Sequence, residues 1–173
     1  MFPPDLIARA AELIARYRAA GLMAATAESC TGGLIAALLT EIPGSSDVLE
    51  RGFVVYSNAA KQDLLGVPAE TLTKYGAVSG ETARAMAEGA LGASRAEVAV
   101  SVTGVAGPDG GTAAKPVGLV HFACARRGRP TTTREERFGD IGREAVRLAS
   151  VRVGLDLLEA AAGADGGTRY TRL

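Results

Sequence analysis

The chain has 173 residues, 47% hydrophobic and 22% charged, a composition typical of one globular domain with its own core. Its 19 basic and 19 acidic side chains balance, so no net charge attracts it to nucleic acid or to an anionic membrane. No apolar run is long enough to span a membrane, and residues 1–21 contain charged side chains that the core of a signal peptide lacks. We expect a cytoplasmic protein that binds neither nucleic acid nor membrane.

Helices alternate with strands through the first 102 residues. Apolar residues at helical spacing predict an amphipathic opening helix, which Gly21 would end. Ser57 and Ser79 are typical caps for two later helices. The predicted elements are a helix after Pro3-Pro4, a strand over 22–27, a helix over 34–42, a strand over 52–56, a helix over 58–65, a helix after Ser79 and a buried strand over 97–102.

The rest of the chain predicts a loop, a hairpin and a helix. Residues 103–116 are rich in glycine and proline and form no regular element, whereas 117–125 and 131–138 are typical of two paired strands. Residues 142–161 predict the last helix, and 163–173 predict a flexible tail because they have little to bury.

Helices interleaved with strands imply a sheet covered on both faces, and the hairpin requires some antiparallel pairing. The predicted fold is therefore a single α/β domain over residues 1–162, a three-layer α/β/α sandwich with a mixed sheet.

The composition limits which residues can form disulfides, bind metal or act as a catalytic base. Two cysteines, Cys30 and Cys124, are too few for a disulfide framework and too scattered for a zinc site. The only histidine, His121, lies in a strand pattern, where a half-buried structural histidine is more common than a catalytic one. We predict no metal and no cofactor, and expect any general base to be a lysine, a tyrosine or a carboxylate.

The segment 27–33, Ala-Glu-Ser-Cys-Thr-Gly-Gly, places hydroxyl and thiol groups between a strand end and a helix N-terminus. Free backbone N–H groups there can stabilise an oxyanion, so Ser29 is a candidate nucleophile. The thiol of Cys30 is a rival, because a helix N-terminus can lower the pKa of a cysteine. Ser29 or Thr31 can instead simply cap the helix, which is the more frequent role of such residues.

Two further segments could border the same site. Asn58 and Lys61 share one helical face after Tyr56, although most lysines are solvated. The loop 103–111 follows a buried strand and can bring backbone amides to an anionic ligand. It matches neither the P-loop nor the dinucleotide-binding fingerprint, and a plain long turn is the alternative.

Several motifs follow one another over about residues 5–160. They are segment 27–33, Glu50-Arg51-Gly52-Phe53 leading to Tyr56-Ser57-Asn58 and Lys61, Gly76-Ala77-Val78-Ser79, and Gly104 to Gly111 with Lys115-Pro116-Val117-Gly118. Together they resemble the CinA C-terminal domain family, which is known for nicotinamide-nucleotide amidohydrolases. The resemblance implies an enzyme that converts nicotinamide mononucleotide to nicotinate mononucleotide and ammonia.

The resemblance also implies site residues. The motif serine of the family is a nucleophile with a lysine as base and a tyrosine nearby, and these positions correspond to Ser29, Lys61 and Tyr56. A lysine acts as a base only when its amine is neutral, so we expect Lys61 to be sheltered. The expected substrate-binding residues are Glu28, Cys30, Thr31, Gly32, Gly33, Asn58, Thr103, Gly104, Gly107 and Arg143, the last binding phosphate or orienting the site.

The family further implies a homodimer that binds a pyridine nucleotide. A non-catalytic nucleotide-binding module, in which Ser29 only caps a helix, is an alternative, against which Tyr56 and Lys61 argue. A competence or DNA-damage accessory protein is another, suggested only by the family's name. The absence of a basic stripe in the sequence argues against direct DNA binding.

Overall fold

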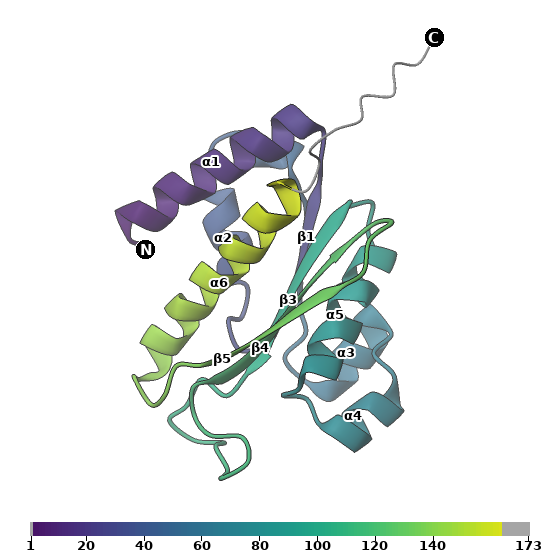
Figure 1. Ribbon diagram of the computed structural model, residues 1–173, viewed down its shortest axis with the longest axis vertical. Coiled ribbons are helices and arrows are strands. Elements are labelled where there is room, and N and C mark those ends of the chain that lie inside the picture. Colours follow the sequence, from purple (N-terminus) through teal and green to yellow (C-terminus); the bar gives the residue numbers. More distant parts are fainter. Residues whose placement is uncertain (1, 164–173) are drawn as a thin grey trace.

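The structure, a computed structural model, describes residues 2–163 (Figure 1). Five strands form one mixed sheet in the order β2-β1-β3-β4-β5. β1 is parallel to both of its neighbours, whereas β4 is antiparallel to β3 and β5. The strands are β1 (Ala24–Glu28), β2 (Leu49–Val54), β3 (Val98–Gly104), β4 (Leu119–Arg126) and β5 (Thr132–Arg137).

Helices cover both faces of this sheet. α1, α2 and α6 lie on one face, and α3, α4 and α5 lie on the other (Figure 1). The α/β fold with a mixed sheet between two helical layers is confirmed. The helices are α1 (Pro4–Ala20), α2 (Leu34–Thr40), α3 (Asn58–Leu65), α4 (Ala69–Tyr75), α5 (Gly80–Gly92) and α6 (Arg143–Gly163), with a 3-10 turn, η1 (Ser45–Asp47).

Local sequence signals decide several helix ends. The hydroxyl of Ser57 accepts a hydrogen bond from an amide in the first turn of α3, and Ser79 does the same for α5. Gly21 ends α1 in the left-handed conformation, at φ 64°. These three predictions are confirmed. Residues 164–173 of the predicted flexible tail lie outside the described residues, and Gly163 belongs to α6.

All five strands differ from their predicted bounds by one to three residues, the first two in ways that affect the site, and one helix was not predicted. β1 begins at Ala24 and reaches Glu28, and β2 ends at Val54, before Tyr56. α4 follows Pro68 and buries one hydrophobic side chain, Leu72, too few to produce a helical pattern.

The packing of α3 on α5 fixes the helix that carries Lys61. Gly89 of α5 lies against Leu65 at the end of α3, where a Cβ atom would come within 2.0 Å of the Leu65 carbonyl oxygen. Only glycine permits this approach of the two backbones. α3 is thereby held over the same end of the sheet at which β1 finishes.

Candidate active site

Ser29 lies at the carboxyl end of β1, between two parallel strands. Its backbone N–H donates to the carbonyl of Val102 in β3, and on the other side Val55, just after β2, donates to the carbonyl of Glu28. Ligands in α/β proteins bind at this kind of edge, beyond the carboxyl ends of parallel strands. Ser29 is 8% exposed, so its hydroxyl lies at the floor of the site.

The Lys61 side chain reaches this hydroxyl from α3. It is 1% exposed, and its Nζ lies 3.2 Å from Ser29 Oγ, 2.9 Å from the carbonyl oxygen of Val55 and 3.3 Å from that of Tyr56. A neutral amine has two N–H groups, which the two carbonyls can accept, and one lone pair, which then faces the Ser29 hydroxyl. The predicted sheltering of Lys61 is confirmed.

Burial also sets the protonation of this amine. Removal from water lowers the pKa of Lys61, because the charged form loses its hydration. No carboxylate forms an ion pair with Lys61 among the described residues, so none offsets this loss with a salt bridge. Burial therefore shifts Lys61 toward its neutral form, the form that can accept a proton from Ser29.

The buried carboxylate of Glu28 organises the loop between β1 and α2. Glu28 is 0% exposed and accepts hydrogen bonds from the Thr31 hydroxyl at 2.7 Å and from the backbone N–H groups of Gly33, Ile35 and Ala36 at 2.9–3.1 Å. A charged acceptor at a helix N-terminus is strongly stabilising. In this structure the side chains of Glu28 and Thr31 bond to each other and to the loop itself.

The backbone amides of this loop are unequally available. Gly32 donates to the carbonyl of Ser29, and Gly33 donates to the buried carboxylate, which corrects the expectation that both could hold an oxyanion. The amides of Cys30 and Thr31 donate to no other described residue. An oxyanion next to Ser29 can therefore be stabilised by these two N–H groups.

The thiol of Cys30 is buried and points into the core. It is 5% exposed, and burial raises its pKa to about 12. A thiol with this pKa is protonated at neutral pH, so it is a poor nucleophile. Of the two adjacent candidates, the structure favours Ser29.

Arg143, at the start of α6, spans the mouth of the site. It donates to the phenol oxygen of Tyr56 at 3.1 Å and to the carbonyl of Gly107 at 2.8 Å. Tyr56 follows β2 and Gly107 follows β3, so the guanidinium bridges the two strands that flank Ser29. Tyr56 is 60% exposed, and its phenol accepts a hydrogen bond from Arg143. Only the backbone carbonyl of Tyr56 contacts the Lys61 amine.

The remaining predicted site residues divide between rim and wall. Asn58 is exposed on the first turn of α3, two residues after Tyr56. Thr103 is 1% exposed and its hydroxyl donates to the carbonyl of Ala77 at 2.8 Å, which corrects its expected role as a ligand contact. Gly104 pairs with Val120 in the sheet, and a Cβ at this glycine would lie 2.7 Å from the Val120 side chain. Gly104 therefore allows close strand packing at the wall.

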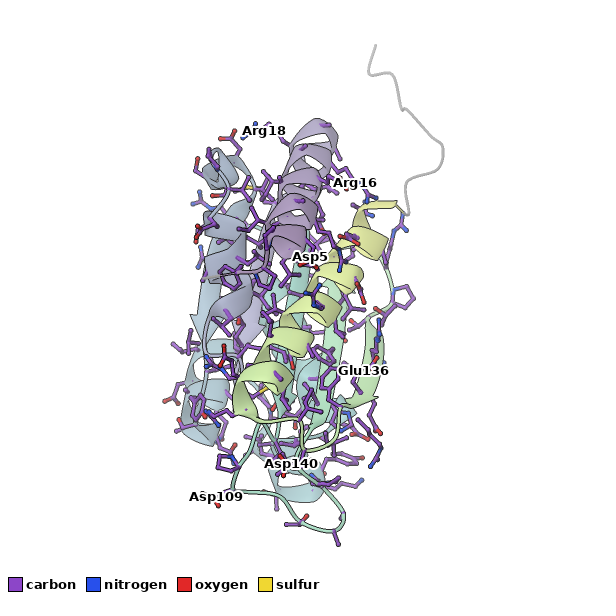
Figure 2. All side chains as sticks on the ribbon, turned by 90° about the vertical axis from the view of Figure 1, so that its left-hand side faces the viewer. Asp5, Arg16, Arg18, Asp109, Glu136 and Asp140 are labelled. Carbon is purple, nitrogen blue, oxygen red and sulfur yellow. The ribbon has the colours of Figure 1, made fainter. Side chains whose placement is uncertain are left out.

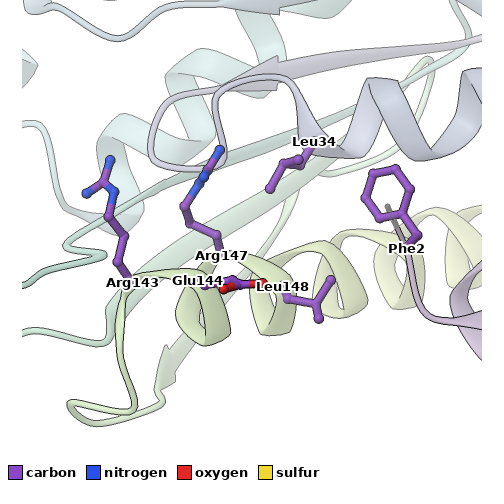
Figure 3. A pocket seen from close by; sticks show the side chains of 6 residues that line it. All are labelled: Phe2, Leu34, Arg143, Glu144, Arg147 and Leu148. Carbon is purple, nitrogen blue, oxygen red and sulfur yellow. The ribbon is translucent and has the colours of Figure 1, made fainter.

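A cavity of about 460 Å³ lies beside the loop, between α2 and the first turns of α6 (Figure 3). The cavity is lined by Phe2, Leu34, Arg143, Glu144, Arg147 and Leu148.

Within residues 2–163, no group of His, Cys, Asp and Glu side chains is arranged to hold a metal ion. Over the same residues, no helix is both long and apolar enough to cross a membrane.

Residues 7–162 match the model of the CinA C-terminal domain. The chain belongs to this family. It is 56% identical over 138 residues to a protein named nicotinamide-nucleotide amidohydrolase PncC from Enterobacter agglomerans, covering 79% of this chain and 83% of that protein. The protein with the same name from Escherichia coli (strain K12) is 52% identical over 142 residues, covering 82% and 85% of the two chains.

A solved CinA structure has the same fold. It is titled the competence/damage inducible protein CihA from Agrobacterium tumefaciens, is 57% identical, covers 92% of this chain and 97% of that chain, and has a TM-score of 0.91. Other relatives are longer, and this chain spans 26% of a putative competence-damage inducible protein from Symbiobacterium thermophilum.

One residue of this CinA domain borders the site although the sequence analysis did not select it. Arg147 donates from Nη2 to the carbonyl of Thr31 at 2.9 Å. Its spacing of four residues from Arg143 places both on one face of a helix, and this was the available signal. The contact itself could not be predicted, because Arg147 and Thr31 are 116 positions apart in the sequence.

Proposed function

We propose that this CinA domain hydrolyses the carboxamide of nicotinamide mononucleotide. The observation that carries the proposal is the buried Lys61 amine, 3.2 Å from the hydroxyl of Ser29 and without an ion-pair partner among the described residues. A serine and a neutral lysine at this separation form a nucleophile and its general base. The relatives named nicotinamide-nucleotide amidohydrolase support the choice of substrate.

In the first half of the reaction, Lys61 takes the proton of Ser29 while Oγ attacks the carboxamide carbon. The carbonyl oxygen becomes an oxyanion, which the amides of Cys30 and Thr31 stabilise. When the tetrahedral intermediate collapses, the C–N bond breaks, the Lys61 ammonium returns its proton to the nitrogen, and ammonia leaves. Ser29 is then acylated by the nicotinate group.

In the second half, water replaces ammonia and the same groups act in the same order. Lys61 takes a proton from the water, and the resulting hydroxide attacks the ester carbon. The ester bond breaks as Oγ recovers a proton from Lys61, and nicotinate mononucleotide leaves. The net reaction consumes one water and releases one ammonia per substrate, with no change in oxidation state.

The other site residues support this chemistry without reacting. Glu28 and Thr31 hold the loop that carries Ser29. Tyr56, Asn58 and Arg143 form the rim that meets the substrate, together with the carbonyl of Gly107 and the backbone of Cys30, Gly32 and Gly33. A direct catalytic role for the Tyr56 phenol, a homodimer and a cytoplasmic location stay predictions from the family and the sequence.

Ammonia release from nicotinamide mononucleotide by the purified chain tests the proposal. We expect one ammonia per nucleotide, undiminished after treatment with EDTA. Ser29→Ala should reduce turnover about a thousandfold or more while the nucleotide still binds. Ser46→Ala, at an exposed position in η1, is the matched control and should not change turnover.

Two results would contradict the proposal in different ways. Binding of the nucleotide without ammonia release by the unaltered chain would indicate a nucleotide-binding module instead of an enzyme. Complete loss of activity in EDTA, restored by one divalent ion, would show a metal-activated water in place of the acylated serine.

A further inference from the structure

The guanidinium of Arg147 bonds to the loop that carries Ser29 but has no carboxylate partner. It extends from α6 toward this loop (Figure 3), and its Nη2 donates to the carbonyl of Thr31 at 2.9 Å. Within residues 2–163, no carboxylate forms an ion pair with it, and its buried Nε has no hydrogen-bond partner. A buried donor without a partner is destabilising, and an apolar side chain of similar length would avoid that cost. Packing alone therefore does not account for a charge at this position.

Two peptide groups lead from Arg147 to the proposed oxyanion site. The first joins Thr31 to Gly32: its carbonyl accepts from Arg147, and its N–H donates to the carbonyl of Ser29 at 3.0 Å. That carbonyl belongs to the second peptide group, which joins Ser29 to Cys30. The N–H of this second group, on Cys30, donates to no other described residue and is one of the two amides available to an oxyanion.

Hydrogen bonds in such a chain polarise one another. A cation at the first carbonyl draws electron density toward itself, so the N–H of the same peptide group becomes a stronger donor, and the second group responds in the same way. The strengthening is about 10–30% per bond. The N–H of Cys30 is therefore a stronger donor to developing negative charge than an isolated amide would be.

The charges around the loop give Arg147 a second reason to matter. The Glu28 carboxylate beside Ser29 is bonded only to neutral donors, so its negative charge opposes the formation of another one nearby. The adjacent thiol of Cys30 feels both charges. Burial contributes most to the raised pKa of Cys30, Glu28 raises this pKa further, and Arg147 lowers it. Arg147 thus offsets the field of the carboxylate within the loop.

We infer that Arg147 is a positioning residue for the reaction, which strengthens the oxyanion-stabilising N–H of Cys30 through the two peptide groups between them. The inference rests on the proposed function and adds a charged residue that acts on the reacting atoms through the backbone. Its effect belongs to the transition state, where the carbonyl oxygen gains charge, and not to the binding of a neutral carboxamide. Loss of the charge should therefore lower kcat with little change in KM.

Two other roles for Arg147 predict different results. If the residue only holds the loop through the Thr31 carbonyl, an uncharged donor of the same shape should serve as well. Citrulline is such a donor, because it has the length of arginine and a terminal NH₂ group but no charge. If Arg147 instead contacts the substrate, its loss should raise KM and should not affect a reagent that shares no part with the nucleotide.

A small fluorophosphonate is a reagent of that kind. Ser29 Oγ attacks the phosphorus, the P–F bond breaks, fluoride leaves, and Lys61 takes the serine proton. The phosphoryl oxygen gains negative charge during the attack and needs the same backbone donors as the carboxamide oxygen. The labelling rate of Ser29 therefore reports on these donors without recognition of the nucleotide.

The experiment measures kcat and KM for nicotinamide mononucleotide, and the fluorophosphonate labelling rate, in four altered chains. Arg147→Gln and replacement of Arg147 by citrulline should each lower kcat and the labelling rate about tenfold, less than the loss of a whole oxyanion donor, with KM nearly unchanged. Arg147→Lys should recover most of both rates, because it keeps a charged donor. Arg152→Gln is the control, since Arg152 lies on the same helix and pairs with Asp5, and it should change neither rate.

The pH dependence of labelling distinguishes a lost charge from a displaced loop. The amine of Lys61 bonds to Ser29, Val55 and Tyr56, so the midpoint of the pH dependence should stay the same in the citrulline form. A shifted midpoint would show that the loop has moved, and would overturn the inference. Full kcat with citrulline, or a raised KM with an unchanged labelling rate, would overturn it as well.

Failure of the inference and failure of the proposed function give different results. Ammonia release by the unaltered chain, with kcat and labelling insensitive to the charge at position 147, contradicts the inference alone. Labelling of Ser29 that depends on this charge, in a chain that releases no ammonia, contradicts the proposed reaction and supports the inference. A chain that neither releases ammonia nor takes the label on Ser29 contradicts both.

Discussion

The loops that follow β1 and β3 flank the same end of the sheet but are built in opposite ways. In the β1 loop, Ser29, Cys30 and Thr31 are 8%, 5% and 0% exposed, and a carboxylate beneath them accepts four hydrogen bonds. In the β3 loop, residues 108–114 are all exposed. Asp109 of that loop lies at the end of the molecule where α6 begins, opposite Arg18 (Figure 2).

This difference separates the chemistry from the contacts around it. The nucleophile and the free amides belong to the loop whose polar groups are fixed before substrate binds, which avoids reorganisation during the reaction. The β3 loop contributes the Gly107 carbonyl from its buried first residues, and its exposed part, residues 108–114, can adapt to a ligand at little cost. Changes in the two loops should therefore have effects of very different size.

After the loss of Ser29 itself, the largest effect should come from Lys61, which approaches the β1 loop from α3. Lys61→Arg keeps the charge but cannot become neutral at usable pH, so turnover should fall about a hundredfold or more, nearly as far as in Lys61→Met. Because burial lowers the pKa of Lys61, activity of the unaltered chain should rise as pH increases through that lowered pKa and level off above it. Near-normal turnover in Lys61→Arg, with the pH dependence lost only in Tyr56→Phe, would assign the base to Tyr56.

The next effect should come from Glu28, which tests whether the β1 loop is fixed by its carboxylate. Glu28→Gln replaces one acceptor oxygen by an NH₂ group facing donors, so the free energy of unfolding should fall by roughly 3 kcal/mol. Chemical denaturation followed by circular dichroism measures this, and turnover at low temperature should fall as well. Glu97→Gln is the control, since Glu97 accepts one backbone N–H, that of Met23, and lies at the other end of the sheet. Equal, small decreases in the free energy of unfolding of both variants would show that the buried Glu28 carboxylate does not fix the β1 loop.

The smallest effect should come from the β3 loop. Lys115 is partly exposed, and its amine donates to the carbonyl of Tyr75 at 2.6 Å. Lys115→Met should change the free energy of unfolding by less than about 1 kcal/mol and raise KM modestly with little change in kcat. A loss of kcat comparable to that of Glu28→Gln would mean that the β3 loop also positions reacting groups.

Much of the fold followed from local signals, whereas the detail of the site depended on contacts distant in sequence. The capping serines and the hairpin are local features, so they were predictable. Pairing with β1 fixes β2 at Leu49–Val54. The residues with high β-propensity had instead predicted this strand over 52–56. The hydrogen bonds that the Glu28 carboxylate accepts from the start of α2 form only because the loop turns back over β1. The contact between Arg147 and Thr31 joins residues 116 positions apart in the sequence.

Labelling with a serine-reactive fluorophosphonate, followed by peptide mass spectrometry, tests the central claim that a neutral Lys61 activates Ser29. We predict one label per chain, on Ser29, with a rate that rises with pH in parallel with turnover. Nicotinamide mononucleotide should protect against it, and Lys61→Arg should abolish it. Iodoacetamide should leave Cys30 unmodified under the same conditions, because burial raises the pKa of its thiol to about 12. An active enzyme that the probe leaves unlabelled, and that loses activity when Cys30 alone is alkylated, would contradict the account.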